Sequence, residues 1–158
     1  NANINTLVLQ QEYLGFIEQT HLDELDPIDN FHFSIPGQYD KLLHHISVHR
    51  WFMGEKLKRT KNEEEAIMGW VNEVYRPLVR IIRKHKILQE FPQRTETDLY
   101  LWIIEHRWYM VEEQHKKVSL ETAARHYVQT FSHKPFRHLR QYFKYIAIKI
   151  RKLTKKQP

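Results

Sequence analysis

The sequence predicts an all-α fold, a helical bundle built from a duplicated three-helix unit, on three observations. The 158 residues include only four Gly and six Pro. So few turn-forming and helix-breaking residues favour long helices over many short strands. Apolar residues recur at helical spacing through most of the chain. The stretch HRWFMGE at residues 49–55 also returns as HRWYMVE at residues 106–112, 57 positions later. This repetition indicates two copies of one helical unit, each burying the apolar face that the other leaves open.

An N-terminal helix and an extended arm are predicted before the duplicated units. The helix is expected over about residues 4–19, where apolar residues follow helical spacing. The next stretch, HLDELDPIDNFHFSIPG at residues 21–37, carries two prolines, four acids and the alternation Phe31, Phe33, Ile35. This composition favours an extended arm whose aromatic side chains dock on the helical body.

The first unit, about residues 38–90, is predicted to contain three helices. The first runs over about residues 38–59. Asn62, with Glu65 three residues later, is a capping-box-like start for the second helix. Pro77 lacks an amide hydrogen and breaks or kinks that helix, so that LVRIIRKHKIL forms the third element.

The second unit repeats this order over about residues 95–153. Thr95 or Thr97 is the expected cap of a helix that extends to about residue 116, and Ser119 is the expected cap of the next helix. Pro135 interrupts that helix, and PFRHLRQYFKYIAIKIRKL then makes a long basic helix.

A chain of this length fits one domain over residues 1–158. Within it we expect the N-terminal helix and arm at 1–37, the first unit at 38–90, and the second unit with its basic C-terminal helix and tail at 91–158. The absence of Cys excludes disulfides and thiolate chemistry. No uncharged run is long enough for a transmembrane segment and no secretion signal opens the sequence, so a cytoplasmic location is expected. Because the sequence starts with Asn and not Met, we expect an excised domain or a trimmed product.

The repeated motif places a His-Arg pair among the apolar residues of each central helix, which is predicted to be apolar almost all round. A buried guanidinium needs carboxylate or carbonyl partners, because desolvating an unpaired charge costs several kcal/mol. One interpretation is therefore structural. Two equivalent bridges, Arg50–Glu64 and Arg107–Glu121, would then lock the first helix of each unit to the second.

The alternative interpretation makes the doubled pair a binding site. Guanidinium groups bind phosphate or carboxylate through two parallel hydrogen bonds, so a small anion is the natural ligand. The anion-binding candidates, which would meet near the pseudo-two-fold axis, are His49, Arg50, His106 and Arg107.

Signals for an enzyme are weaker. HISVH at residues 45–49 puts two imidazoles on one helix face, but Ile46 stands where a zincin-type motif has Glu. Glu112 and His115 make one ExxH pair where a di-iron bundle needs two. The sequence has neither a GxSxG elbow nor a phosphate-cradling glycine loop, so no catalytic residue, metal or cofactor is predicted. A metal- or anion-dependent enzyme using His45, His49, His106 and nearby glutamates remains an alternative.

Charge is unevenly distributed along the chain. Residues 1–121 carry 15 Lys or Arg against 19 Asp or Glu, whereas residues 122–158 carry ten Lys or Arg and no acid. Basic faces are predicted on the third helix of each unit, with the candidates Arg76, Arg80, Arg83, Lys84, Arg137, Arg140, Lys144 and Arg151. In the second unit these cations oppose an apolar stripe of Leu139, Phe143, Ile146 and Ile150. Such a distribution predicts an anionic partner, which is an acidic protein, a neighbouring domain or nucleic acid, or an acidic surface elsewhere in the same protein. The alternative is that these cations form only the solvated side of amphipathic helices.

Three stretches give the chain a resemblance to a known family: LLHHISVHRWFMGE, EAIMGWVNEVYRPLV and FPQRTETDLYLWIIEHRWYM. It resembles an uncharacterised bacterial helical family, a domain of unknown function that in other proteins can follow a lipopolysaccharide-kinase-like domain. The resemblance covers about residues 21–132. It implies an accessory or regulatory module and carries over no catalytic residues. The family pattern has Gly at the position of Gln93, which puts the turn between the two halves in question.

These observations favour a non-enzymatic binding or regulatory module that contacts an anionic partner through a basic C-terminal face. The alternative within binding proteins is a nucleic-acid-binding, DNA-associated regulatory domain, supported by Tyr142 and Tyr145 among the basic residues. No helix-turn-helix, zinc finger or RNP-like sequence adds to that support.

Overall fold

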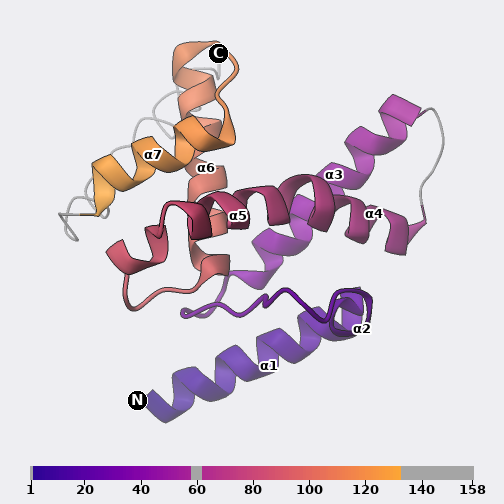
Figure 1. The fold of residues 1–158 in the computed structure, drawn as a ribbon. Helices are drawn as coiled ribbons and strands as arrows, with labels where there is room; N and C mark the ends of the chain where they lie inside the picture. Colours follow the sequence, from indigo (N-terminus) through magenta and orange to yellow (C-terminus); the bar gives the residue numbers. More distant parts are fainter. Residues whose placement is uncertain (1, 58–61, 133–158) are drawn as a thin grey trace, which may run out of the picture.

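The computed structural model describes residues 2–57 and 62–132, and over these ranges the chain forms helices and no strands (Figure 1). The elements in chain order are α1 (Ala2–Thr20), α2 (Leu22–Leu25), α3 (Tyr39–Leu57), α4 (Glu63–Trp70), the π-helical turn η1 (Val71–Tyr75), α5 (Arg76–Lys84), the 3₁₀ turn η2 (Ile87–Glu90), α6 (Glu96–Gln114) and α7 (Leu120–Phe131). The all-α prediction is confirmed, including the N-terminal helix. None of the described helices is long and apolar enough to cross a membrane.

Three predicted helix starts are confirmed by their side-chain caps. Asn62 Oδ1 accepts the backbone N–H of Glu65 at 2.7 Å at the start of α4. Thr95 and Asp98 form a complete capping box at the start of α6, and the Ser119 hydroxyl caps α7. These side chains bind N–H groups that have no partner within the first helical turn.

Pro77 does not end the helix that begins at Glu63. α4, η1 and α5 follow one another without a gap from Glu63 to Lys84, and the π-helical turn directly precedes the proline segment. Proline offers no N–H to the carbonyl one turn before it, so the backbone there needs a different pairing, which a wider turn supplies. The third element of the first unit is therefore a continuation of the second.

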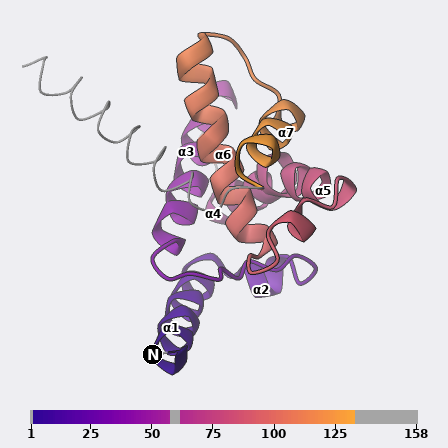
Figure 2. The same cartoon turned by 90° about the vertical axis from the view of Figure 1, so that its left-hand side faces the viewer.

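The duplicated units form two equivalent helix pairs, because α3 packs on α4 and α6 packs on α7. α5 leaves the first pair and packs against both helices of the second, while α1 lies at one end of the bundle (Figures 1 and 2). α3 and α6 meet where Lys41 Nζ lies 3.1 Å from Glu105 Oε1, and they separate toward their C-terminal ends (Figure 1).

The predicted extended arm, residues 21–37, begins with the short helix α2 and is not extended over Leu22–Leu25. The rest of it, between α2 and α3, packs on the bundle through its aromatic side chains. Phe31 and Phe33 are buried in the main core, which confirms this prediction. The Phe31 ring centroid lies 4.8 Å from that of Tyr75, and Phe33 meets Tyr39 edge-on at 4.8 Å. The arm is thus part of the hydrophobic core.

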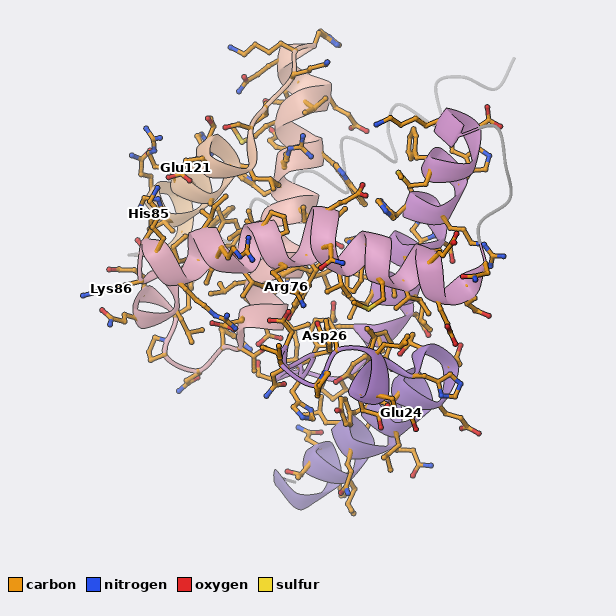
Figure 3. The ribbon with its side chains drawn as sticks, turned by 45° about the vertical axis from the view of Figure 1, so that its right-hand side comes forward. Glu24, Asp26, Arg76, His85, Lys86 and Glu121 are labelled. Atoms are coloured by element: carbon orange, nitrogen blue, oxygen red, sulfur yellow. The ribbon has the colours of Figure 1, made fainter. Side chains whose placement is uncertain are left out.

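Two aspartates of the arm also share one arginine of α5. Arg76 Nη2 donates to Asp26 Oδ2 and Arg76 Nε donates to Asp29 Oδ2, each at 2.9 Å (Figure 3). Burial, together with the neighbouring Asp29 carboxyl, raises the pKa of Asp26, while Arg76 opposes that shift. The hydrogen bond that Arg76 donates to Asp29 in turn raises the pKa of Arg76. The segment 26–34 is anchored further by Ser34, whose backbone N–H donates to Asp98 Oδ1 at 3.1 Å.

Gln93 occupies the turn before α6 without backbone strain. Among the described residues, the non-glycine positions with positive φ are His21, Lys86 and His115, and Gln93 is not one of them. Glutamine is therefore compatible with this turn, where the resemblance led us to expect Gly.

Candidate functional site

The predicted bridge between Arg107 and Glu121 is not formed. Arg107 Nε donates to the backbone carbonyl of Val118 at 2.6 Å, which ties α6 to the turn before α7. Glu121 instead faces α5, where it is hydrogen-bonded to His85 and lies 3.9 Å from Lys84 Nζ (Figure 3). A carbonyl therefore takes the place of the carboxylate that the repeat suggested.

The equivalent prediction for the first unit, a bridge between Arg50 and Glu64, is also wrong. Arg50 is exposed on α3, and within the described ranges no ion pair joins it to Glu64. The prediction that both central helices are covered almost all round fails for this part of α3. Trp51 and Phe52 are 62% and 60% exposed, and Trp108, the counterpart of Trp51, is 42% exposed. Phe52 lies two helical turns after His45, on the side of α3 where the His45 ring meets Trp108. Because α3 and α6 separate toward their C-terminal ends (Figure 1), Phe52 stays exposed.

The histidines of the two motif copies contact the second half of their own unit. His49 Nε2 lies 3.9 Å from Glu73 Oε2 in η1. His106 Nε2 lies 2.8 Å from His126 Nδ1 in α7. The contacts of the four anion-binding candidates thus belong to two helix pairs, and their role in anion binding stays a prediction.

A buried polar chain joins α3, α4 and α6 through His45, Trp70 and Tyr100. The sequence patterns singled out His45, as a residue of the enzyme alternative, but not Trp70 or Tyr100. Trp70 Nε1 donates to the Tyr100 hydroxyl oxygen at 3.1 Å, and His45 Nδ1 lies 3.1 Å from the same oxygen. All three side chains are buried. Burial, with a smaller contribution from the charges of His44 and Lys41, lowers the pKa of His45 to about 4. Because the Tyr100 hydroxyl oxygen accepts the hydrogen bond from Trp70, the Tyr100 O–H can donate to Nδ1 of a neutral His45.

This burial predicts that stability depends on pH. In the unfolded chain His45 binds a proton near pH 6.5, and in the folded chain only near pH 4. The free energy of unfolding is therefore highest above pH 6.5 and decreases as the pH falls toward 4. The loss between pH 7 and pH 5 is about 2 kcal/mol. Urea denaturation of the wild type and of His45→Gln at both pH values checks this. The wild type should lose that much more than the variant, and an equal loss in both would contradict the assignment.

The predicted basic face on α5 is partly neutralised by carboxylates distant in sequence. Arg76 is held by the arm aspartates. Arg83 donates from Nε and Nη2 to the two carboxylate oxygens of Glu96, both at 2.8 Å, which raises the pKa of Arg83. Lys84 shares Glu121 with His85. The other predicted basic residues, Arg137, Arg140, Lys144 and Arg151, lie outside the described residues, as does Pro135.

α5 and the turn after it nevertheless end in a group of exposed cations, which we call the cationic end of α5. It consists of Arg80, Arg83, Lys84, His85 and Lys86. Lys86 lies at the end of the helix (Figure 3), and within the described ranges neither Arg80 nor Lys86 takes part in an ion pair. Sequence periodicity pointed to the first three of these cations, but not to His85 and Lys86, because they lie beyond the last helical turn.

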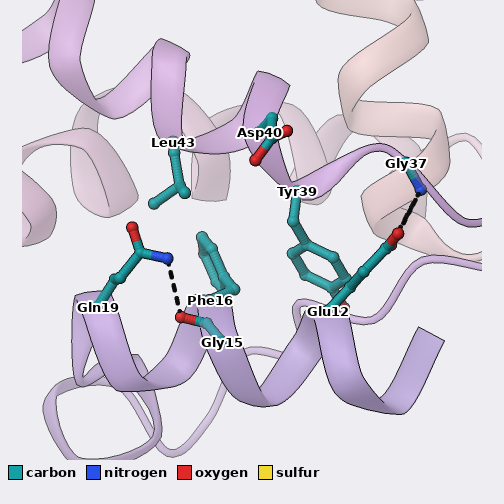
Figure 4. A pocket seen from close by; sticks show the side chains of 8 residues that line it. All are labelled: Glu12, Gly15, Phe16, Gln19, Gly37, Tyr39, Asp40 and Leu43. Carbon is teal, nitrogen blue, oxygen red and sulfur yellow. Dashed lines mark hydrogen bonds between the residues drawn. The ribbon is translucent and has the colours of Figure 1, made fainter. Parts of the chain in front are cut away.

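The described residues contain no group of three or more His, Asp or Glu side chains placed to hold a metal ion. A hollow of about 220 Å³ lies between α1 and α3 (Figure 4). The polar groups at its edge bind the chain itself, since the Glu12 carboxylate accepts the N–H of Gly37 and the Gln19 amide donates to the carbonyl of Gly15. Its remaining lining residues are Phe16, Tyr39, Asp40 and Leu43.

A family model described as "Domain of unknown function (DUF4032)" matches residues 38–131. The match begins one residue before α3 and ends with α7, so it covers both helix pairs and leaves out α1 and the arm. Comparison with curated proteins and with solved structures finds no match.

Proposed function

Because the chain belongs to the family described as domain of unknown function (DUF4032), we propose a function from its own surface: a non-enzymatic binding or regulatory module that contacts an anionic partner through a basic face. The partner is an acidic segment of another protein or of a neighbouring domain. The observation that carries this proposal is the excess of exposed cations at the cationic end of α5.

The excess follows from the ion pairs. Four Lys or Arg side chains of this group face two exposed or half-buried carboxylates, those of Glu96 and Glu121, which leaves two positive charges in excess. Asp29 also lies 3.7 Å from Arg83, but it is already bound by Arg76. Arg80 and Lys86 supply the excess. Exposed charges of this kind attract an oppositely charged partner at low salt and are screened at high salt.

The basic composition of the chain after α7 supports the same kind of partner. Residues 133–158 contain nine Lys or Arg and no acid. A local excess at α5 and a basic segment in the same chain both favour association with an anionic surface.

The double variant Arg80→Gln/Lys86→Gln should bind a fluorescein-labelled oligoglutamate peptide about tenfold more weakly than the wild type does at low salt. The reason is that the variant loses two charge contacts of moderate strength. Fluorescence anisotropy measures this. The matched control is Lys56→Gln/Lys116→Gln, which removes the same charge from α3 and from the turn after α6, away from the end of α5 (Figure 1). Equal weakening by both pairs would mean that net charge alone attracts the peptide, and the proposed face would be wrong.

The same titration with labelled mixed-sequence DNA and RNA distinguishes the nucleic-acid alternative. Binding to duplex DNA would show a salt slope of about 0.9 for each phosphate neutralised. If DNA or RNA bound more tightly than the peptide, and the α5 variant reduced that slope, the partner would be nucleic acid and not an acidic protein.

A further inference from the structure

The helix α1 has two apolar sides, and the bundle covers one of them. On the covered side, Phe16 is buried in the main core. The other side carries four apolar residues, of which all but Val8 are more than half exposed: Ile4, Leu7, Val8 and Leu14. A surface helix ordinarily has a single apolar side. The second apolar side of α1, at the end of the bundle (Figures 1 and 2), therefore indicates a contact with another surface.

These four residues form one stripe centred on Gln11. Successive residues of a helix lie about 100° apart around its axis. Each of the four then lies within about 60° of Gln11, whereas Phe16 lies about 140° away. We call this set the outer stripe of α1, and it consists of Ile4, Leu7, Val8, Gln11 and Leu14.

The outer stripe is complementary to a second copy of itself in an antiparallel pair of helices. A two-fold axis that passes next to Gln11 places residues that precede it level with residues that follow it by the same number of positions. Leu7 of one copy is then level with Gly15 of the other, and Val8 is level with Leu14. Gly15 has no side chain, and nothing lies within 4 Å of the position that a Cβ would take there. The space level with each Leu7 is therefore open, which allows the two helices to approach closely.

The charges of α1 fit the same pairing. α1 has no Lys or Arg, and its first turn has no acid. In the antiparallel pair, Glu18 of one copy is level with Ile4 in the first turn of the other, where unpaired N–H groups favour a negative charge. The two Glu18 residues lie about 21 Å apart along the pair, beyond the range of strong repulsion in salt. The other acid of α1, Glu12, is already bound to the N–H of Gly37.

We propose that this chain forms a homodimer in which two α1 helices pack antiparallel along their outer stripes. A single pair of helices is at the small end of stable interfaces, so the expected dissociation constant is about 10 µM. The dimer does not rest on the proposed anionic contact, because the outer stripe and the cationic end of α5 belong to different helices.

Cysteine cross-linking tests this pairing directly, because the chain has no Cys of its own. In a pair of packed helices, the two Cα atoms at position 11 would lie within about 6 Å of each other, a distance that a disulfide spans. Gln11→Cys should therefore form a disulfide-linked dimer under mild oxidation at least about tenfold faster than the control Gln10→Cys. Gln10 is also exposed on α1 but points about 100° away from the two-fold axis. Equal rates for both variants would indicate random collision and would overturn the proposal.

Sedimentation velocity of the full chain, from about 1 to about 200 µM, measures the association without a cross-link. Leu7→Lys/Leu14→Lys should weaken the dimer at least about tenfold, because it places cations in the apolar contact. The matched control is Trp51→Lys/Phe52→Lys, which replaces two equally exposed apolar side chains of α3 and should dimerise like the wild type. A wild type that stays monomeric at the highest concentration overturns the proposal. Loss of the dimer in the α3 control alone also overturns it, because the contact would then lie on α3.

Discussion

Replacing Arg76 by Met is expected to lower the free energy of unfolding by about 4 kcal/mol, the cost of leaving buried charges without their partner. Arg76 binds both Asp26 and Asp29 at 2.9 Å, and the side chains of these aspartates are only 3% and 2% exposed. Without the guanidinium, two neighbouring carboxylates would be buried with no cation in contact except Arg83, which lies 3.7 Å from Asp29. Urea denaturation at neutral pH measures the loss.

The pH dependence of Arg76→Met distinguishes this cause from a loss of packing. Burial and the neighbouring Asp29 already raise the pKa of Asp26 in the intact protein, and removing Arg76 takes away the group that opposes the rise. A carboxyl with a raised pKa binds its proton in the fold at a higher pH than in the unfolded chain, so the variant should recover stability as pH falls through that window. A deficit that does not change with pH would contradict the electrostatic explanation.

The matched control for this substitution is Arg80→Met on the same helix. Arg80 is exposed and forms no ion pair within the described ranges, so its loss should change stability by less than about 0.5 kcal/mol. Similar effects of the two substitutions would mean that the aromatic side chains alone hold the arm.

Asp98→Ala is expected to cost about 3 kcal/mol, because it leaves two part-buried backbone N–H groups without an acceptor. The Asp98 carboxylate is 1% exposed. It accepts the N–H of Thr95 at 2.8 Å, closing the capping box of α6, and the N–H of Ser34 at 3.1 Å, holding the arm. Thermal or urea unfolding measures the cost, and hydrogen exchange at the Ser34 amide should become faster in the variant.

Two comparisons separate the parts of this effect. Ser119→Ala removes the exposed cap of α7 and should cost about 1 kcal/mol, as single caps do. Asp98→Asn keeps one acceptor oxygen, so its cost in unfolding free energy should lie between those of Ser119→Ala and Asp98→Ala. If Asp98→Ala cost no more than Ser119→Ala, the bond to Ser34 would contribute nothing to stability.

Arg76→Met and Asp98→Ala both remove contacts with the arm, which lies outside the matched family segment. That segment begins at residue 38, yet Phe31 and Phe33 are in the core and Asp26, Asp29 and Ser34 are bound to α5 and α6. In this chain the stability of the helix pairs therefore depends on residues that precede them.

Features that depend on residues near one another in the chain could be predicted from the sequence. Helical periodicity predicted the all-α fold, and Asn62, Thr95 and Ser119 were found as caps because a cap acts on an N–H two or three residues away. The alternation of Phe31 and Phe33 predicted the docking of the arm for the same reason. For the candidate site, periodicity also placed Arg80 and Lys84 on an exposed face of α5.

The partner of each charged side chain and the exposure of the motif residues could not be predicted, because both depend on how the helices pack. Arg76 pairs with aspartates about 50 positions earlier in the chain. Arg107 donates to the backbone carbonyl of Val118, whereas the repeat predicted an ion pair with Glu121. Phe52 is exposed because α3 separates from α6 at an angle that no local pattern encodes. Ion pairs and burial act over a few ångströms in space, so they depend on which distant segments the packing of the helices brings together.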